Sequence, residues 1–393
     1  MSSERSQAPR VNYLDWLRVL AVAGVFVFHA MHPFDTADWH VKNAEQTDAL
    51  LIVLAFLGSW GLAFFFLIAG AGSFLALRWR TVRQYVNERL TRLLLPLLVA
   101  YALFSPLQFM IEERHDGGST GSILGDARRF IVNIWDEPPL LLADTYHLWF
   151  VVFLLEFSLL GLPLFAWLRG PRGQRLTNWL GRMVQRRGVI LLLVIAFAVV
   201  HVALQGAPGE DHGWGEFVYY FDFFLLGHVL MCDARLTDAV RRHLAPALLL
   251  GFAGMTLLLV TDVPGFLEQW WEDPSYSWRY AGVFALLTVQ AWGWVVAALS
   301  LGMRAPAFQR PVPGAVATAT MPFFIVHQPV ILLVAFYVVQ WDVGIAGKLA
   351  VVLIVSLLVS AALAWALSRV PTISLLFGAK RPQPVSSEKA SLR

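Results

Sequence analysis

The first long apolar run of the chain, residues 14–31, is long enough to cross a bilayer but carries two ionisable side chains, Arg18 and His29. A charged side chain in hydrocarbon costs at least about 2.5 kcal/mol, so such groups usually serve a function. The two residues are eleven positions apart, or about three helical turns. Both side chains therefore return to nearly the same helix face, about 16 Å apart. The spacing predicts a polar stripe through the membrane, as expected for a reaction or transport path.

The composition indicates a membrane protein built from helices. Of 393 residues, 58% are hydrophobic and 15% charged, whereas soluble domains have about 45–50% apolar and about 25% charged residues. Apolar windows of spanning length predict an all-α, polytopic protein with about ten transmembrane helices. The windows lie near residues 14–32, 50–77, 93–111, 147–168, 189–205, 216–232, 244–262, 280–302, 315–340 and 347–368. We expect residues 1–377 to form one integral membrane domain and the polar residues 378–393 to be a disordered tail.

The basic residues orient this predicted topology. If both termini are cytoplasmic, 23 of the 30 Lys and Arg residues fall on the cytoplasmic side, six fall outside, and Arg18 lies within the first span. Such a bias is typical of multi-pass proteins. Because the basic residues gather at helix ends, the charge favours a bilayer and not nucleic acid as partner. The single cysteine and the absence of His/Cys metal motifs leave metal and ATP chemistry unsupported.

Two features of the first helix have more than one reading. Asp15 lies three residues before Arg18, close enough for a local ion pair that would merely anchor the helix at the inner interface. A lone histidine near an interface is often structural. His29, however, shares a stripe with Arg18, and His32 follows one turn later.

A second basic motif precedes the third span. Arg89 and Arg92 form an R-x-x-R pair, which places both guanidinium groups on one side of the predicted helix start. Helix N-termini favour anions, and arginine suits bidentate phosphate contacts. The pair is therefore either a phosphate-binding site or an ordinary cytoplasmic anchor.

Further candidates lie on other spans and loops. His147 begins the fourth span, Glu156 falls deeper in it, and His327 lies between two prolines of the ninth span. The second span contains glycines that allow close helix packing, at positions 58, 61, 70 and 72. The outer loop between the first two spans is rich in Trp39, His40 and carboxylates.

These motifs together resemble the membrane acyltransferase-3 family. The resemblance comprises the LDWLRVLAV run, the Arg18-x10-His29 spacing, FFFLIAG in the second span, Arg89-x-x-Arg92 before LLLP, HLWF from His147, and FIVHQP around His327. These motifs follow the family's order over roughly residues 12–330, and the count of ten helices agrees. Within the family, the chain looks most like the branch that adds succinyl groups to periplasmic glucans. It departs from many relatives at residues 69–72, where AGAG replaces a pattern with a serine-glycine pair.

The resemblance implies an O-acyltransferase of the bacterial inner membrane. Such an enzyme takes an acetyl or succinyl group from cytoplasmic acyl-CoA and transfers it to a hydroxyl of an extracytoplasmic carbohydrate. Arg89, Arg92 and Arg18 would hold the donor phosphates, and His29 would act as general base or as transient acyl carrier. His147 or His327 would stabilise the oxyanion, and Glu156 would orient a histidine. The competing function is a transporter or flippase of glycan or lipid intermediates that uses the same charges as a relay.

Overall fold

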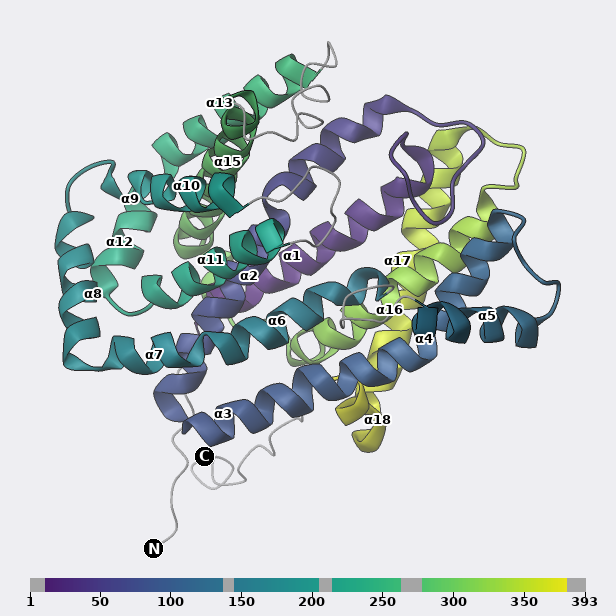
Figure 1. Ribbon diagram of the computed structural model, residues 1–393, viewed down its shortest axis with the longest axis horizontal. Helices are drawn as coiled ribbons and strands as arrows, with labels where there is room; N and C mark the ends of the chain where they lie inside the picture. The colour runs from purple at the N-terminus through teal and green to yellow at the C-terminus, as the bar shows by residue number, and fades with distance from the viewer. Residues whose placement is uncertain (1–10, 137–144, 205–213, 263–277, 380–393) are drawn as a thin grey trace, which may run out of the picture.

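The computed structural model describes residues 11–136, 145–204, 214–262 and 278–379, and every regular element among them is helical (Figure 1). The first half of the chain forms α1 (Asn12–Met31), η1 (His32–Phe34), η2 (Asp48–Leu50), α2 (Leu51–Trp79), α3 (Val82–Arg89), η3 (Leu90–Leu94), α4 (Leu95–His115), α5 (Ile123–Asp136), η4 (Tyr146–Leu148), α6 (Trp149–Leu160), α7 (Leu162–Arg169) and α8 (Pro171–Met183). The second half forms α9 (Val189–Leu192), α10 (Val194–Leu204), α11 (Trp214–Leu230), α12 (Ala234–Arg242), α13 (Leu244–Asp262), α15 (Trp278–Arg304), η5 (Pro306–Gln309), α16 (Gly314–Val338), α17 (Ile345–Arg369) and α18 (Pro371–Leu376). The predicted all-α class is confirmed.

Within the described residues, seven helices are long and apolar enough to cross a membrane. The number rises to nine if two bent pairs, α6 with α7 and α12 with α13, each count as one span. The predicted span at residues 189–205 corresponds to a shorter apolar segment, Val189–Leu204. The count of ten and the cytoplasmic termini therefore stay predictions. Most of the predicted tail, from residue 380 onward, lies outside the described residues.

One predicted boundary is wrong. We expected the third span to begin near residue 93, but the helical segment begins at Val82 and continues to His115. Thr81 caps it, with its side chain accepting from Gln84 N while the Gln84 side chain accepts from Thr81 N. Hydropathy overlooked these first two turns because they are polar, whereas a capping box sets a helix start independently of hydropathy. Arg89 and Arg92 thus lie inside a continuous helix and not at its N-terminus.

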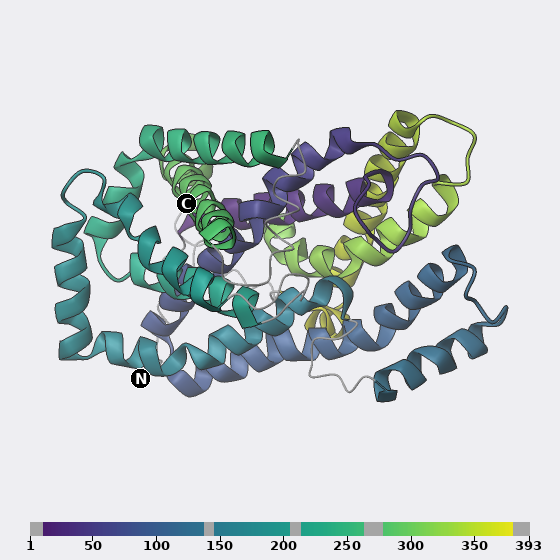
Figure 2. The ribbon, with the colours of Figure 1, turned by 45° about the horizontal axis from the view of Figure 1, so that its top comes forward.

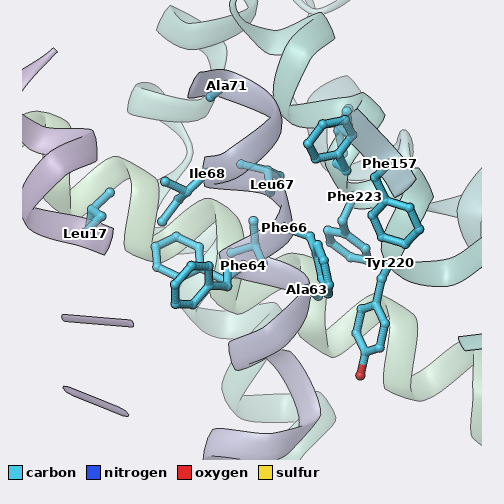
Figure 3. Close-up of a cluster of buried hydrophobic side chains, with 14 of the residues drawn as sticks. Leu17, Ala63, Phe64, Phe66, Leu67, Ile68, Ala71, Phe157, Tyr220 and Phe223 are labelled. Carbon is cyan, nitrogen blue, oxygen red and sulfur yellow. The ribbon is translucent and has the colours of Figure 1, made fainter. Parts of the chain in front are cut away.

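Helix α2 is the centre of the packing, with α1, α11, α15 and α6 against it (Figures 1 and 2). Figure 3 shows the cluster that α2 builds with its neighbours, in which Phe66 and Ile68 are fully buried together with Phe157 of α6. Contact with α11 is close enough to bring backbones together. A Cβ atom built on Gly70 would lie 1.8 Å from the Phe224 carbonyl oxygen, so the glycine permits this approach.

The peripheral helices turn their large apolar side chains outward. On α17, Ile354 and Leu358 are about three-fifths exposed, at 59% and 63%. The opposite face is small and buried, with Ser356, Ser360 and Ala364 at spacings of four residues, and α17 packs against α16. Large apolar residues outside and small residues inside are the pattern of helices surrounded by lipid. The fold therefore supports a multi-pass membrane protein.

Candidate active site

Three histidines far apart in the sequence meet at one end of α1. His29 of α1, His147 of η4 and His327 of α16 have ring centroids 5.2 Å (His29–His327), 4.9 Å (His147–His327) and 6.4 Å (His29–His147) apart. His147 and His327 are almost fully buried, and His29 is partly exposed. The structure thus brings together three of the residues singled out in the sequence. Across the described part of the chain, no group of three or more His, Cys, Asp or Glu side chains is arranged to hold a metal ion.

Proline in α16 explains how His147 is fixed. In an α-helix the carbonyl of residue 325 would accept from the N–H of residue 329, but that residue is Pro329 and has no N–H. The Ile325 carbonyl instead accepts from His147 Nε2, at 3.0 Å. The proline therefore supplies the acceptor that orients His147, and the Nδ1 atom of His147 is buried without a partner.

Hydrogen bonds determine which nitrogen of His29 is left for chemistry. His327 Nδ1 lies 2.5 Å from the Phe324 carbonyl oxygen, which can only accept, so Nδ1 carries the proton. With neutral rings, Nε2 of His327 is then an acceptor, and His29 Nδ1, 2.9 Å away, must donate to it. The Nε2 atom of His29 consequently keeps its lone pair. A lone pair on a partly exposed imidazole can accept a proton or attack a carbonyl carbon.

Arg18 lies on the same helix as His29, toward the opposite end. Because α1 is unbroken from Asn12 to Met31, the predicted spacing of three turns holds. Arg18 forms the expected ion pair with Asp15, at 2.9 Å. Its guanidinium also approaches α2, where a Cβ atom built on Gly72 would lie 3.5 Å from Nη2. The small residue at position 72 therefore leaves room for Arg18.

Arg89 contacts α2 at Ser73, the residue after Gly72. Its Nη2 donates to Ser73 Oγ at 3.2 Å, and Tyr85 OH donates to the same oxygen at 2.9 Å. The guanidinium carbon lies 4.7 Å from the centre of the Tyr85 ring, which adds a cation–π contact. Ser73 and Tyr85, both fully buried, thus hold Arg89 against α2, at the residue after Gly72, which Arg18 approaches. Sequence reasoning missed these two residues, although a serine in an apolar helix and a tyrosine one turn before Arg89 were available signals.

Arg92, together with Arg18, Arg80 and Arg89, forms a cluster of four arginines that we call the basic group. Arg92 sits in η3, a π-helical turn, a distortion that is common at functional sites. Glu88 accepts from Arg92 at 2.9 Å and pairs with Arg80 at 3.1 Å. The positive charges of Arg89, Arg80 and Arg18 all act on Arg92. Four arginines therefore share two carboxylates, Asp15 and Glu88, which leaves the group with excess positive charge.

Glu156 is the one predicted site residue that the structure leaves apart. Its Oε2 atom is buried without a hydrogen-bond partner, and the bonds of the three histidines go to one another and to backbone carbonyls. His147 and His327 bond carbonyls of α16, and the predicted role of Glu156 in orienting a histidine stays a prediction.

Comparisons with known proteins identify the family of this chain. A family model described as an acyltransferase domain matches residues 11–369, nearly the whole chain. The chain belongs to the acyltransferase-3 family. Glucans biosynthesis protein C of Escherichia coli strain K12 is 24% identical over 98% of this chain and 99% of its own length. The protein of the same name from E. coli O9:H4 strain HS is similar to the same extent. No solved structure matches this chain.

Membership of the acyltransferase-3 family and the resemblance to the glucan branch are thus confirmed. The family model covers Arg18, His29, Arg89, Arg92, His147 and His327. The chain is therefore a membrane acyltransferase, and α1 carries both the titratable His29 and one arginine of the basic group, Arg18.

Proposed function

We propose that this protein transfers an acetyl or succinyl group from cytoplasmic acyl-CoA to a hydroxyl of an extracytoplasmic glycan, as an O-acyltransferase of the bacterial inner membrane. The observation that carries the proposal is the orientation of His29. Its Nδ1–H is committed to His327, and its Nε2 lone pair is left for the substrate. The glucan-related names of the relatives favour a carbohydrate acceptor.

The donor would bind at the basic group. Coenzyme A carries phosphates, and arginine matches phosphate oxygens with paired N–H donors. Arg18 approaches Gly72 of α2, and Arg89 donates to the next residue, Ser73. Arg92 is close enough to both arginines to interact with their charges. The pantetheine arm would then extend along α1, over the roughly 16 Å between Arg18 and His29.

The chemical step needs no more than the atoms already described. The acceptor hydroxyl gives its proton to His29 Nε2, its oxygen bonds to the thioester carbonyl carbon, and the carbon–sulfur bond breaks. The leaving thiolate recovers the proton from His29 as free CoA. A covalent variant, in which Nε2 first carries the acyl group, uses the same atom. His147 and His327 already donate their N–H groups to carbonyls, so we assign them the positioning of His29.

Calorimetry on the detergent-purified protein tests the donor site. We expect micromolar binding of acetyl-CoA, succinyl-CoA or CoA that the Arg89→Ala/Arg92→Ala variant loses. Arg83→Ala is the matched control, because this arginine lies on the same helix but is exposed. Tighter binding of one thioester would identify the acyl group.

The rival function has a distinct outcome. A transporter or flippase of a glycan or lipid intermediate would use the intramembrane charges without CoA. Folded protein that binds none of the three ligands would therefore overturn the acyl-CoA proposal and favour transport. Binding that survives in the double variant would instead leave Arg89 and Arg92 as cytoplasmic anchors.

A further inference from the structure

Aromatic rings line the outer side of His29. Trp39, in the loop after η1, lies with its ring centroid 6.5 Å from that of His29 and nearly parallel to it, at 15°. The same indole lies 5.7 Å from His32 and 5.4 Å from His40. Trp39 is partly exposed. A flat apolar surface is thus held directly beside the reactive imidazole.

A carboxylate lies next to this surface. Glu112, near the end of α4, accepts from His40 Nδ1 through Oε1 and from Tyr146 OH through Oε2, each at 2.9 Å. The His40 ring also contacts the Tyr146 ring, with centroids 4.8 Å apart. An ionised carboxylate has about four acceptor positions, so each oxygen of Glu112 can accept a further hydroxyl. About a third of the Glu112 side chain, 31%, is exposed.

The surroundings hold these groups rigidly. The loop of Trp39 is tied to α4 through Lys42 N and His115 Nε2, at 3.0 Å. Tyr146 has a left-handed backbone, with φ of 51°, a conformation that costs roughly 1–3 kcal/mol in a residue other than glycine. This strained residue directly precedes His147. Such strain is concentrated at functional sites.

We propose that Trp39, Glu112, His40 and Tyr146 form the acceptor subsite, and that it binds an uncharged sugar ring; this rests on the proposed function. The C–H face of a pyranose packs on an indole, while its hydroxyls donate to a carboxylate. Stacking on Trp39 places another hydroxyl of the same ring beside His29. The carboxylate of Glu112 disfavours anionic sugars, and the nearby cation of Lys42 is already paired with Asp35, at 2.8 Å.

The competing account is a latch that only fastens the outer loop to α4. A latch and a subsite differ in what a substitution changes. Loss of a latch lowers stability and impairs every reaction of the enzyme. Loss of a subsite raises the acceptor KM and spares the reaction of acyl-CoA with water, which needs no sugar.

The test uses the full-length protein with its preferred acyl-CoA and a panel of neutral glucose oligosaccharides that differ in linkage. Trp39→Ala and Glu112→Gln should each raise the acceptor KM about tenfold or more, a larger change than in acyl-CoA hydrolysis or in thermal stability. Trp39→Tyr keeps an aromatic surface and should retain most of the affinity. Trp341→Ala is the matched control, since this tryptophan is 48% exposed and lies in the turn after α16.

The outcomes separate the two proposals. An unchanged acceptor KM in Trp39→Ala, or a parallel loss of stability and hydrolysis in both variants, would overturn the subsite. A wild-type protein that neither transfers to any sugar nor hydrolyses acyl-CoA would overturn the proposed function itself. Faster transfer to an anionic sugar than to its neutral counterpart would contradict the assigned preference.

Discussion

His29 Nδ1 and His327 Nε2 lie 2.9 Å apart although 298 positions separate them in the chain. The other nitrogen of His327 is bound to the Phe324 carbonyl of its own helix. Backbone geometry in α16 therefore determines the direction of the His29 ring in α1. Orientation by a neighbour that is itself fixed is the arrangement expected of a preorganised catalytic group.

Replacing His29 tests its role directly. His29→Ala should lower the turnover of acyl transfer by about a hundredfold to ten-thousandfold, the usual contribution of a general base, and by more if the imidazole carries the acyl group. Acyl-CoA binding should persist, because Arg18 lies three turns away on α1 and the other arginines of the basic group lie on or next to α2, α3 and η3. Steady-state turnover and calorimetry on the same preparation measure both quantities. Normal turnover in this variant would exclude both roles.

His327 should act through His29. His327→Ala removes the acceptor for His29 Nδ1–H, and we expect kcat to fall about a hundredfold with the KM for acyl-CoA nearly unchanged. His327→Gln offers an amide oxygen in a similar place and should recover part of the loss. The pH dependence of kcat should also shift in His327→Ala, because His29 loses a hydrogen-bond partner. Equal activity of the Ala and Gln variants would argue against an orienting role.

The sequence was sufficient for α1 and for the class of fold. Hydropathy found the apolar segments, and the helical period placed Arg18 and His29 on one stripe before any contact was known. The start of the third span at Val82 was not predicted, because its first two turns are polar. The capping box at Thr81 sets that helix start despite the low hydropathy. Local signals of capping therefore carry information that an apolar window discards.

The site was only partly predictable for a different reason. His147 and His327 were singled out, but their contact with His29 depends on how α1, η4 and α16 pack. Pro329 offered a signal that was not used, because a proline inside a helix frees a specific carbonyl for another donor. Glu112 and Trp39 lie on separate segments, and only the folded chain brings Trp39 beside His29 and Glu112 to Tyr146, the residue before His147.

Glycines of α2 give a prediction about stability. Gly70→Ala would place a methyl group against the Phe224 carbonyl of α11, so we expect a loss of about 1–3 kcal/mol from forced separation of the helices. Gly61 has no neighbouring atom within 4 Å of a built Cβ. Gly61→Ala should therefore be neutral, or stabilising by up to about 1 kcal/mol through helix propensity. Thermal unfolding in detergent compares the two, and similar Tm values would contradict the close packing of α2 and α11.

The ion pair under the loop after η1 predicts a pH dependence. Asp35 is completely buried and binds Lys42 at 2.8 Å and His32 at 2.7 Å. Burial alone raises the pKa of Asp35, but the close contacts with His32 and Lys42 outweigh it and hold that pKa below its ordinary value. A carboxyl group with a lowered folded-state pKa stabilises the protein above its unfolded pKa of about 3.9. That contribution is lost as the pH falls through the lower folded-state pKa.

Asp35→Asn should therefore cost about 3 kcal/mol at neutral pH, since it leaves Lys42 without its carboxylate. The Tm difference between wild type and Asp35→Asn should shrink as the pH falls below about 4, because only the wild type titrates there. Asp38→Asn is the matched control, since Asp38 lies in the same loop and is exposed, and it should leave Tm unchanged at every pH. A Tm difference for Asp35→Asn that stays constant down to pH 2 would show that the loop does not depend on this charge.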